Sequence, residues 1–213
     1  MKDDILIIGE HHRQAAEQIW QIILPGIKDQ PAKYLITVAG ESGAGKSEIA
    51  FALADLLEKS NTPALIIQQD DYFIFPPATN ARKRVQDISW VGSGEVRLDL
   101  LNRHIQEIRN SATDIVKPLV IFSEDRITEE KTNLSPYRVI IFEGTYTSLL
   151  EDIDCRIFID RNYKDTSGDR LRRNREKQDD YLEKILQIEH IIIAPHIGKA
   201  DIIITRNFEV TKP

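Results

Sequence analysis

Residues 40–47, GESGAGKS, hold the side chains whose types and spacing point most directly to chemistry. The spacing G-x-x-x-x-G-K-S suits phosphate binding, because glycines let the backbone turn its N–H groups toward an anion. Lys46 adds positive charge toward the β- and γ-phosphates, and the Ser47 hydroxyl can ligate Mg²⁺. The motif predicts a bound nucleotide contacted by residues Gly40, Ser42, Gly43, Ala44, Gly45, Lys46 and Ser47.

The surroundings of this motif favour a phosphate loop over an ordinary glycine turn. Residues 34–39, YLITVA, form a β-branched run before it, and apolar residues recur with helical period after Lys46. A phosphate loop needs this order, because the strand delivers the loop and the N-terminus of the following helix attracts the anion. We therefore predict a strand, a phosphate loop (P-loop, or Walker A motif) and a helix in succession.

Three carboxylates follow other apolar runs. Asp70 and Asp71 come after residues 64–68, and Glu143 ends residues 138–143. Phosphoryl transfer needs a group that orients or deprotonates the nucleophile and an acidic anchor for the metal. Either aspartate is a candidate base, and the acid at the end of the second run is a candidate Mg²⁺ ligand. The alternatives are an aspartate pair that starts a turn or caps a helix, and a solvated strand end.

A local basic stretch spans residues 161–177, with seven Lys or Arg against three Asp or Glu. Charge runs are commonly solvated helix faces. In a phosphotransferase, however, arginines on a mobile segment close over the phosphates, neutralise developing charge and exclude water. We predict a lid over residues 161–180, with four candidate arginines, Arg170, Arg172, Arg173 and Arg175.

The elements that must position these groups alternate along the chain. Short β-branched runs predict strands, and segments with helical period lie between them. This alternation predicts an α/β fold, a doubly wound parallel sheet in a single domain over residues 1–213, with ligands at the carboxyl ends of the strands. The predicted strands are residues 5–8, 34–39, 64–68, 138–143, 155–160 and 201–205.

Two segments interrupt the alternation. Residues 115–134 form two extended runs and predict a hairpin beside the sheet. Residues 72–94 contain Pro76, Pro77 and further breakers, which favour an ordered loop after a strand. This loop is our candidate acceptor site, and its basic residues suit an anionic acceptor such as a sugar phosphate or carboxylate, unless they form a solvated turn. The candidate acceptor contacts are Asp71, Tyr72, Arg82 and Arg84.

Composition narrows the class of protein. The chain has 213 residues and a net charge of -6, which argues against nucleic acid as the main partner. No apolar run approaches the roughly 18 to 20 residues of a membrane span. Cys155 stands alone and cannot form an internal disulfide, which suits a reducing compartment. We expect a cytoplasmic protein with a small-molecule partner and no membrane partner, and a homo-oligomer is compatible with the sequence.

Several pieces of the chain together resemble one known family, the uridine kinase and phosphoribulokinase group of P-loop kinases. The resemblance covers roughly residues 34–207 in order. It implies a doubly wound sheet with an arginine lid, ATP with Mg²⁺ as phosphate donor, and a hydroxyl acceptor activated by an aspartate. The similar pieces are GESGAGKS, QDDYF, PYRVIIFEG, DRLRRNRE, YLEKILQIEH and KADIIITRN.

The resemblance also implies individual roles. Asp70 of QDDYF becomes the catalytic base, beside Lys46 as a catalytic cation. Asp70, Ser47 and Glu143 become the metal-side groups. In the lid, Arg170 and Arg173 become the catalytic arginines, with Arg172 and Arg175 close to the donor phosphates.

The acceptor region departs from the family pattern. Uridine kinases place Tyr-Asp in the first hairpin strand and a histidine shortly afterwards, whereas this chain has Val120, Ile121 and Glu124 there. The acceptor is thus a nucleoside or, alternatively, a sugar, sugar phosphate or hydroxy acid. A rival from another class is a nucleotide-dependent regulatory switch without a small-molecule acceptor. That class needs segments that sense the γ-phosphate, and the sequence has no guanine-binding N-K-x-D string.

Overall fold

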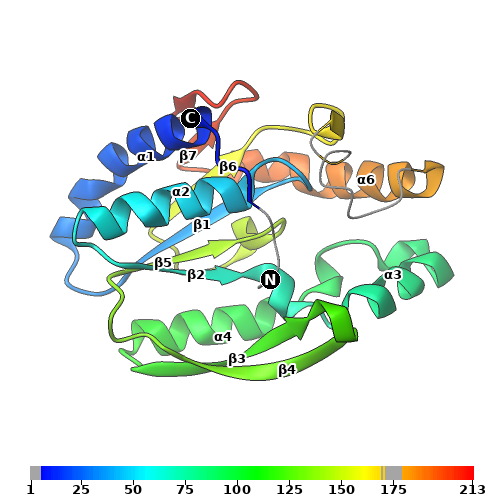
Figure 1. The fold of residues 1–213 in the computed structure, drawn as a ribbon, viewed down its shortest axis with the longest axis horizontal. Helices are drawn as coiled ribbons and strands as arrows, with labels where there is room; N and C mark the ends of the chain where they lie inside the picture. The colour runs from blue at the N-terminus through cyan, green and yellow to red at the C-terminus, as the bar shows by residue number, and fades with distance from the viewer. Residues whose placement is uncertain (1–5, 169, 171–178) are drawn as a thin grey trace.

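The main sheet of the protein has six strands in the order β2-β5-β1-β6-β7-β8 (Figure 1). The structure is a computed structural model that describes residues 6–168, 170 and 179–213. All neighbours pair in parallel except β7 and β8, which are antiparallel. The doubly wound parallel sheet predicted from the sequence is confirmed. The strands are β1 (Tyr34–Gly40), β2 (Ala64–Gln68), β5 (Val139–Glu143), β6 (Cys155–Ile159), β7 (Ile202–Ile204) and β8 (Val210–Thr211).

Helices cover both faces of this sheet (Figure 1). Because successive strand residues point to opposite faces, β1 divides its side chains between two cores. Ile36 and Val38 join the core beneath α1 and α2, and Leu35 and Ala39 join the core that α4 and the end of α6 complete. All seven residues of β1 are buried, which explains its continuous apolar run. The helices are α1 (Glu10–Asp29), α2 (Lys46–Lys59), α4 (Leu98–Arg109) and α6 (Asp180–Ile193).

The predicted hairpin forms a separate two-stranded antiparallel sheet of β3 (Asp114–Ile121) and β4 (Arg126–Asn133). A buried carboxylate attaches this sheet to the turn after β2. Asp71 Oδ2 lies 2.9 Å from Lys117 Nζ, and its Oδ1 accepts a hydrogen bond from the Val120 N–H at 3.0 Å. The hairpin and the end of β2 are therefore held in one fixed arrangement.

The predicted first strand, residues 5–8, is wrong in its described part. Residues 6–9 form no strand and lead into α1, where Ile8 packs against the core of α1 and α2. Ile7 is 68% exposed. In the described residues 6–9, Ile8 thus reaches the core while Ile7 faces solvent, and none of these four residues joins a strand of the sheet.

The segment from 72 to 94 is ordered, but it is more than a loop. It contains α3 (Pro77–Gln86), which begins at a proline. Proline suits the first position of a helix, because its missing N–H is unpaired there in any case and its φ is already helical. The proline pair that predicts a loop thus marks the start of a helix.

The ion pair between Asp71 and Lys117 should contribute strongly to stability. Asp71→Ala leaves the buried Lys117 ammonium with Glu130 as its remaining carboxylate and removes the acceptor of the Val120 N–H, so we expect the free energy of unfolding to fall by about 2 kcal/mol. Urea denaturation measures this loss. Asp114→Ala is the control, because the pair of Asp114 with Lys131 is largely exposed and should change stability by less than about 1 kcal/mol. Equal effects of the two variants would contradict the anchoring role.

Candidate active site

The phosphate loop joins the end of β1 to the start of α2, as its sequence context predicts. Gly43 and Gly45 have φ angles of 78° and 101°, in the left-handed region that glycine adopts without strain. The helix begins at Lys46, whose Nζ donates to the Glu41 carbonyl at 2.8 Å. Residues 40–47 therefore have the strand-loop-helix form that binds phosphate at a helix N-terminus.

Arg170, the described member of the predicted lid arginines, lies against this loop. A Cβ at Gly43 would come within 3.1 Å of the Arg170 Cγ and 3.3 Å of the Thr166 Cβ. The Thr166 hydroxyl also donates to the Ser42 carbonyl at 3.2 Å. The start of the basic segment is thus packed on the phosphate loop. The other three arginines, Arg172, Arg173 and Arg175, lie outside the described residues.

Glu143 and Asp70 meet at the carboxyl edge of the sheet. Glu143 pairs in register with Gln68, the last residue of β2, and Asp70 follows in the 3₁₀ turn Gln69–Tyr72. The Glu143 Oε1 accepts hydrogen bonds from Ser47 Oγ at 3.3 Å and from Gln68 Nε2 at 3.2 Å. A carboxylate at the strand end is therefore joined to the first turn of α2.

Burial disfavours the charge of both carboxylates. It raises the pKa of Glu143 to about 7, with a further rise from the nearby charge of Asp70 and a partial offset from Lys46. Burial also raises the pKa of Asp70, while the positive charge of Lys46 lowers it. Lys46 thus provides a cation for two poorly solvated acids at the mouth of the phosphate loop.

The two adjacent aspartates have different surroundings. Asp70 is partly exposed, whereas Asp71 is 3% exposed and bonded to the hairpin. Tyr72 has no exposed surface, and its hydroxyl lies 2.9 Å from Nδ1 of His104. Asp71 and Tyr72, two of the predicted acceptor contacts, are thus bonded to other residues of the protein, and Asp70 is the aspartate that interacts with the charge of Lys46 in the phosphate loop.

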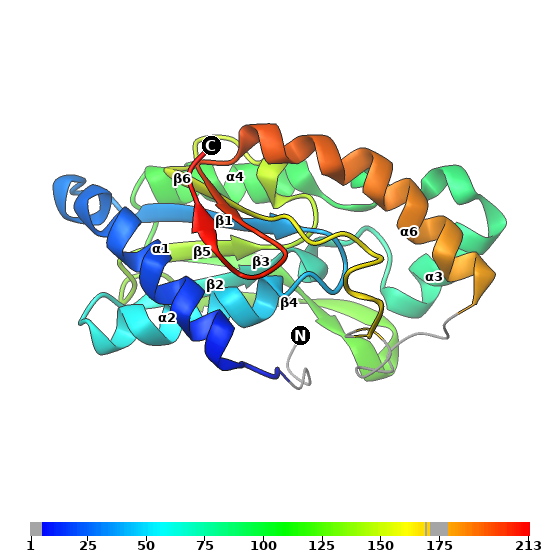
Figure 2. The ribbon, with the colours of Figure 1, turned by 90° about the horizontal axis from the view of Figure 1, so that it is seen from above.

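Arg82 and Arg84, the other predicted acceptor contacts, are both paired with carboxylates. Arg82 lies 3.3 Å from Asp125, at the hairpin tip, and is largely exposed. Arg84 bonds Glu95 and also Glu189 of α6, which lies beside α3 (Figure 2). Arg82 and Arg84, which predict an anion site, are thus each paired with carboxylates of the protein itself.

Glu41 lies within the phosphate loop and makes contacts that its sequence pattern does not predict. It is 5% exposed, its Oε2 accepts the Tyr163 N–H at 2.7 Å, and its Oε1 lies 2.6 Å from His190 Nδ1. This carboxylate attaches the phosphate loop to the start of the basic segment and to α6. No local pattern could identify it, because its imidazole partner is 149 residues away.

The helix α1 also reaches the phosphate loop. A Cβ at Gly45 would lie 3.4 Å from His12 Nε2 and 3.4 Å from Phe208 Cε1. The Arg161 guanidinium stands 4.8 Å from the centre of the Phe208 ring, and one of its N–H groups donates to the Ala44 carbonyl. Residues from both ends of the chain therefore surround the loop where α2 begins.

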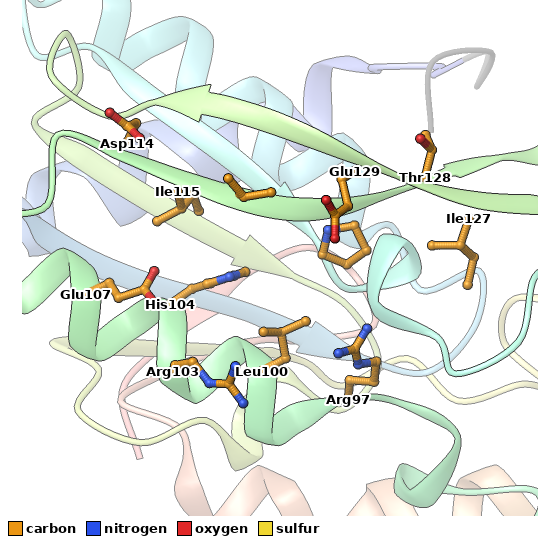
Figure 3. Close-up of a pocket in the computed structure, with 12 residues that line it drawn as sticks. Arg97, Leu100, Arg103, His104, Glu107, Asp114, Ile115, Ile127, Thr128 and Glu129 are labelled. Atoms are coloured by element: carbon orange, nitrogen blue, oxygen red, sulfur yellow. The ribbon is translucent and has the colours of Figure 1, made fainter.

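A cavity of about 700 Å³ lies between α4 and the hairpin (Figure 3). Its floor includes His104, whose pKa is lowered chiefly by burial and whose ring bonds Tyr72. No residue of the phosphate loop lines this cavity, so it is separate from the candidate active site. Its lining consists of Arg97, Leu100, Arg103, His104, Glu107, Asp114, Ile115, Val116, Pro118, Ile127, Thr128 and Glu129.

The donor set at the phosphate loop fits Mg²⁺. This ion binds through one or two protein carboxylates, substrate phosphates and retained waters, without an all-protein cage. Ser47 and Glu143 supply a hydroxyl and a carboxylate that already touch, with Asp70 nearby. Within the described residues, no cluster of three or more His, Cys, Asp or Glu could hold a metal on its own. A site completed by nucleotide phosphates agrees with both observations.

A family model described as "Phosphoribulokinase / Uridine kinase family" matches residues 35–211. The chain belongs to this family. It is accordingly a P-loop kinase, a phosphotransferase that acts on a hydroxyl group. The matched range includes the phosphate loop, both strand-end carboxylates and the basic segment, whereas α1 precedes it.

Individual relatives agree with this assignment. A uridine kinase of Haemophilus influenzae (strain PittGG) is 26% identical over 172 residues, covering 78% of this chain and 79% of the relative. A uridine kinase of Shewanella piezotolerans is 28% identical over 187 residues, covering 81% and 87%. A solved structure of D-glycerate 3-kinase from Cryptococcus neoformans shares the fold, with a TM-score of 0.63 and 13% identity over 93% of this chain and 99% of that chain. Among the described helices, none has the length and apolar character to span a membrane.

The raised pKa of Glu143 predicts a pH-dependent stability. In metal-free buffer, between pH 4.5 and about 7, Glu143 keeps its proton in the native state but loses it in the unfolded chain. This group therefore lowers stability as pH rises from its ordinary pKa of 4.5 to about 7, by roughly 3 kcal/mol in total. Asp70 acts in the same direction.

Glu143→Gln removes the titrating group, so its free energy of unfolding should fall less than that of the wild type across this pH range. Urea denaturation at several pH values with EDTA measures the difference. Glu183→Gln, an exposed change on α6, serves as control and should follow the wild type. Parallel pH profiles of the wild type and Glu143→Gln would contradict the raised pKa.

Proposed function

We propose that this kinase transfers the γ-phosphoryl group of ATP, bound with Mg²⁺, to a hydroxyl group of a small molecule. The observation that carries the proposal is the position of Asp70. This aspartate follows β2 at the carboxyl edge of the sheet, interacts with the charge of Lys46, and lies close enough to Glu143 to raise its pKa. A base beside a phosphate loop and a carboxylate that can bind the metal are groups that phosphoryl transfer to an alcohol uses.

Each group contributes a separate part of the reaction. The loop N–H groups and Lys46 hold the donor phosphates, and Arg170 adds positive charge over the loop. Ser47 and Glu143 would hold Mg²⁺, which neutralises charge on the phosphates when bound. Asp70 accepts the proton of the acceptor hydroxyl. Its raised pKa suits this task, because a general base is most effective when its pKa approaches the working pH.

Membership of the family does not specify the chemical class of the acceptor. A relative and a solved structure of the same fold are named for different acceptors, uridine and D-glycerate. The hairpin of this chain has Val120 and Ile121 where uridine kinases have polar residues. A site without those polar groups distinguishes nucleosides poorly. We place the reaction in the cytoplasm, in keeping with the single cysteine.

Asp70→Asn should separate binding from chemistry. The variant keeps the phosphate loop, so ATP affinity should stay within a few-fold of the wild type, while turnover falls roughly 10²- to 10⁴-fold with loss of the base. Lys46→Ala should weaken both, because it removes a phosphate contact. Calorimetric titration with ADP and an ADP-release assay give the two readouts. Turnover retained by Asp70→Asn would remove this residue as the base.

A further inference from the structure

Three consecutive residues of the phosphate loop, 41–43, lie against the start of the basic segment. Two backbone bonds of helical type shape that start, from the Thr166 N–H to the Asn162 carbonyl at 3.2 Å and from the Arg170 N–H to the Thr166 carbonyl at 3.0 Å. Side chains three and four positions apart share one face of such a turn, and this face follows the loop. The contacting pairs are Glu41 with Tyr163, Ser42 with Thr166, and Gly43 with Arg170.

The first pair depends on a buried carboxylate that has two partners. Glu41 is 5% exposed; its Oε2 accepts the Tyr163 N–H at 2.7 Å, and its Oε1 lies 2.6 Å from Nδ1 of His190 on α6. The Tyr163 side chain packs with Leu182 and Leu186 of the same helix. One carboxylate of the phosphate loop thus holds both the start of the basic segment and the helix that follows this segment.

Arg170 is the last residue of this face. Its Nη1 donates a hydrogen bond to the Thr166 hydroxyl oxygen, and that hydroxyl donates to the Ser42 carbonyl at 3.2 Å. Its Cγ would be 3.1 Å from a Cβ at Gly43, a close approach that the missing side chain of glycine allows. The arginine is therefore placed by contacts with the loop, and the turn that begins at Tyr163 sets where these contacts form.

A carboxylate is an unexpected side chain in a loop that binds phosphates. If its charge were its only effect, Glu41 would repel the donor, and its removal would strengthen nucleotide binding. Both carboxylate oxygens of Glu41, however, have partners that belong to the basic segment and to α6. If these bonds place Arg170, removal of the carboxylate weakens binding, because the loop loses a well-placed cation. The two explanations therefore predict changes of opposite sign.

We infer that Glu41 is a positioning residue of the donor site. It holds the basic segment so that Arg170 stands over the phosphate loop, and His190 supports it from α6. The inference rests on the proposed function, in which Arg170 adds positive charge over the loop, and it identifies the residue on which that placement depends. In this role Glu41 acts through Arg170 and does not itself contact the nucleotide.

Nucleotide affinity gives the sign of the effect. Binding of a non-hydrolysable ATP analogue with Mg²⁺ is measured by calorimetry, after circular dichroism has shown that each variant is folded. We expect Glu41→Ala to bind roughly tenfold more weakly, as when one charged contact is lost. Glu41→Gln keeps an oxygen for the Tyr163 N–H and should recover most of this loss. Equal or tighter binding by Glu41→Ala, or no recovery by Glu41→Gln, overturns the inference. Glu183→Ala, the control, removes an exposed charge from α6 and should bind like the wild type.

A double-mutant cycle tests the dependence on Arg170 itself. Arg170→Ala should weaken binding roughly tenfold in the wild-type background but less than about threefold in the Glu41→Ala background, because the cation is already displaced there. A contribution of Glu41 to folding alone would not make the two effects on binding interdependent. Equal losses in both backgrounds, or no loss in either, overturn the positioning role. If Glu41→Ala does not fold, His190→Ala replaces it, since His190 is 40% exposed, and the loss caused by Arg170→Ala should again be smaller in that background.

These measurements record binding, so they separate the inference from the proposed reaction. Failure of the cycle leaves phosphoryl transfer intact, because the ADP-release assay with Asp70→Asn tests that reaction on its own. If the wild type binds no nucleotide, the proposed function fails, and the inference fails with it.

Discussion

The candidate site depends on keeping two poorly solvated carboxylates, Asp70 and Glu143, close together. They stand at the carboxyl ends of neighbouring strands, where burial disfavours their charges and the charge of Asp70 raises the pKa of Glu143. Such a pair is costly unless positive charge lies close by. Lys46 supplies one cation, and a divalent metal held with the donor phosphates would supply more. The protein thus holds Asp70 and Glu143 at a position where a metal bound with the donor phosphates would stabilise their negative charges.

The rest of the fold keeps this arrangement rigid. Asp71 holds the hairpin to the turn that carries Asp70, and Glu41 holds the phosphate loop to the start of the basic segment and to α6. The two adjacent aspartates therefore differ in position: Asp70 lies at the surface of the site and Asp71 is buried inside the protein. The ion pairs of Arg84 with Glu95 and Glu189 join α3 to α6 in the same way. Each of these contacts uses a buried acid, a group that stabilises a structure only when its partners are fixed.

The phosphate loop, the main strands and the strand-end acids could be predicted from the sequence, because each depends on local spacing. The loop needs glycines before Lys46, and each acid needs only to follow an apolar run. The other features depend on tertiary packing, which the local sequence pattern does not show. Residues 6–9 lead into α1 instead of joining the sheet, and the proline pair after Phe75 starts α3. Partners as distant as Glu41 and His190, or Arg84 and Glu189, leave no periodic signal in the sequence.

The central claim, transfer of a phosphoryl group to an organic hydroxyl, is tested most directly by following the label of [γ-³²P]ATP. The full chain is incubated with Mg²⁺ and a mixture of nucleosides, sugars, sugar phosphates and hydroxy acids, and the products are separated. We expect the label to enter an organic phosphate ester only when an acceptor is present, and we expect Lys46→Ala to lose this product. Label that emerges solely as inorganic phosphate, at a rate independent of the acceptor, would contradict the account and indicate a nucleotide-hydrolysing switch.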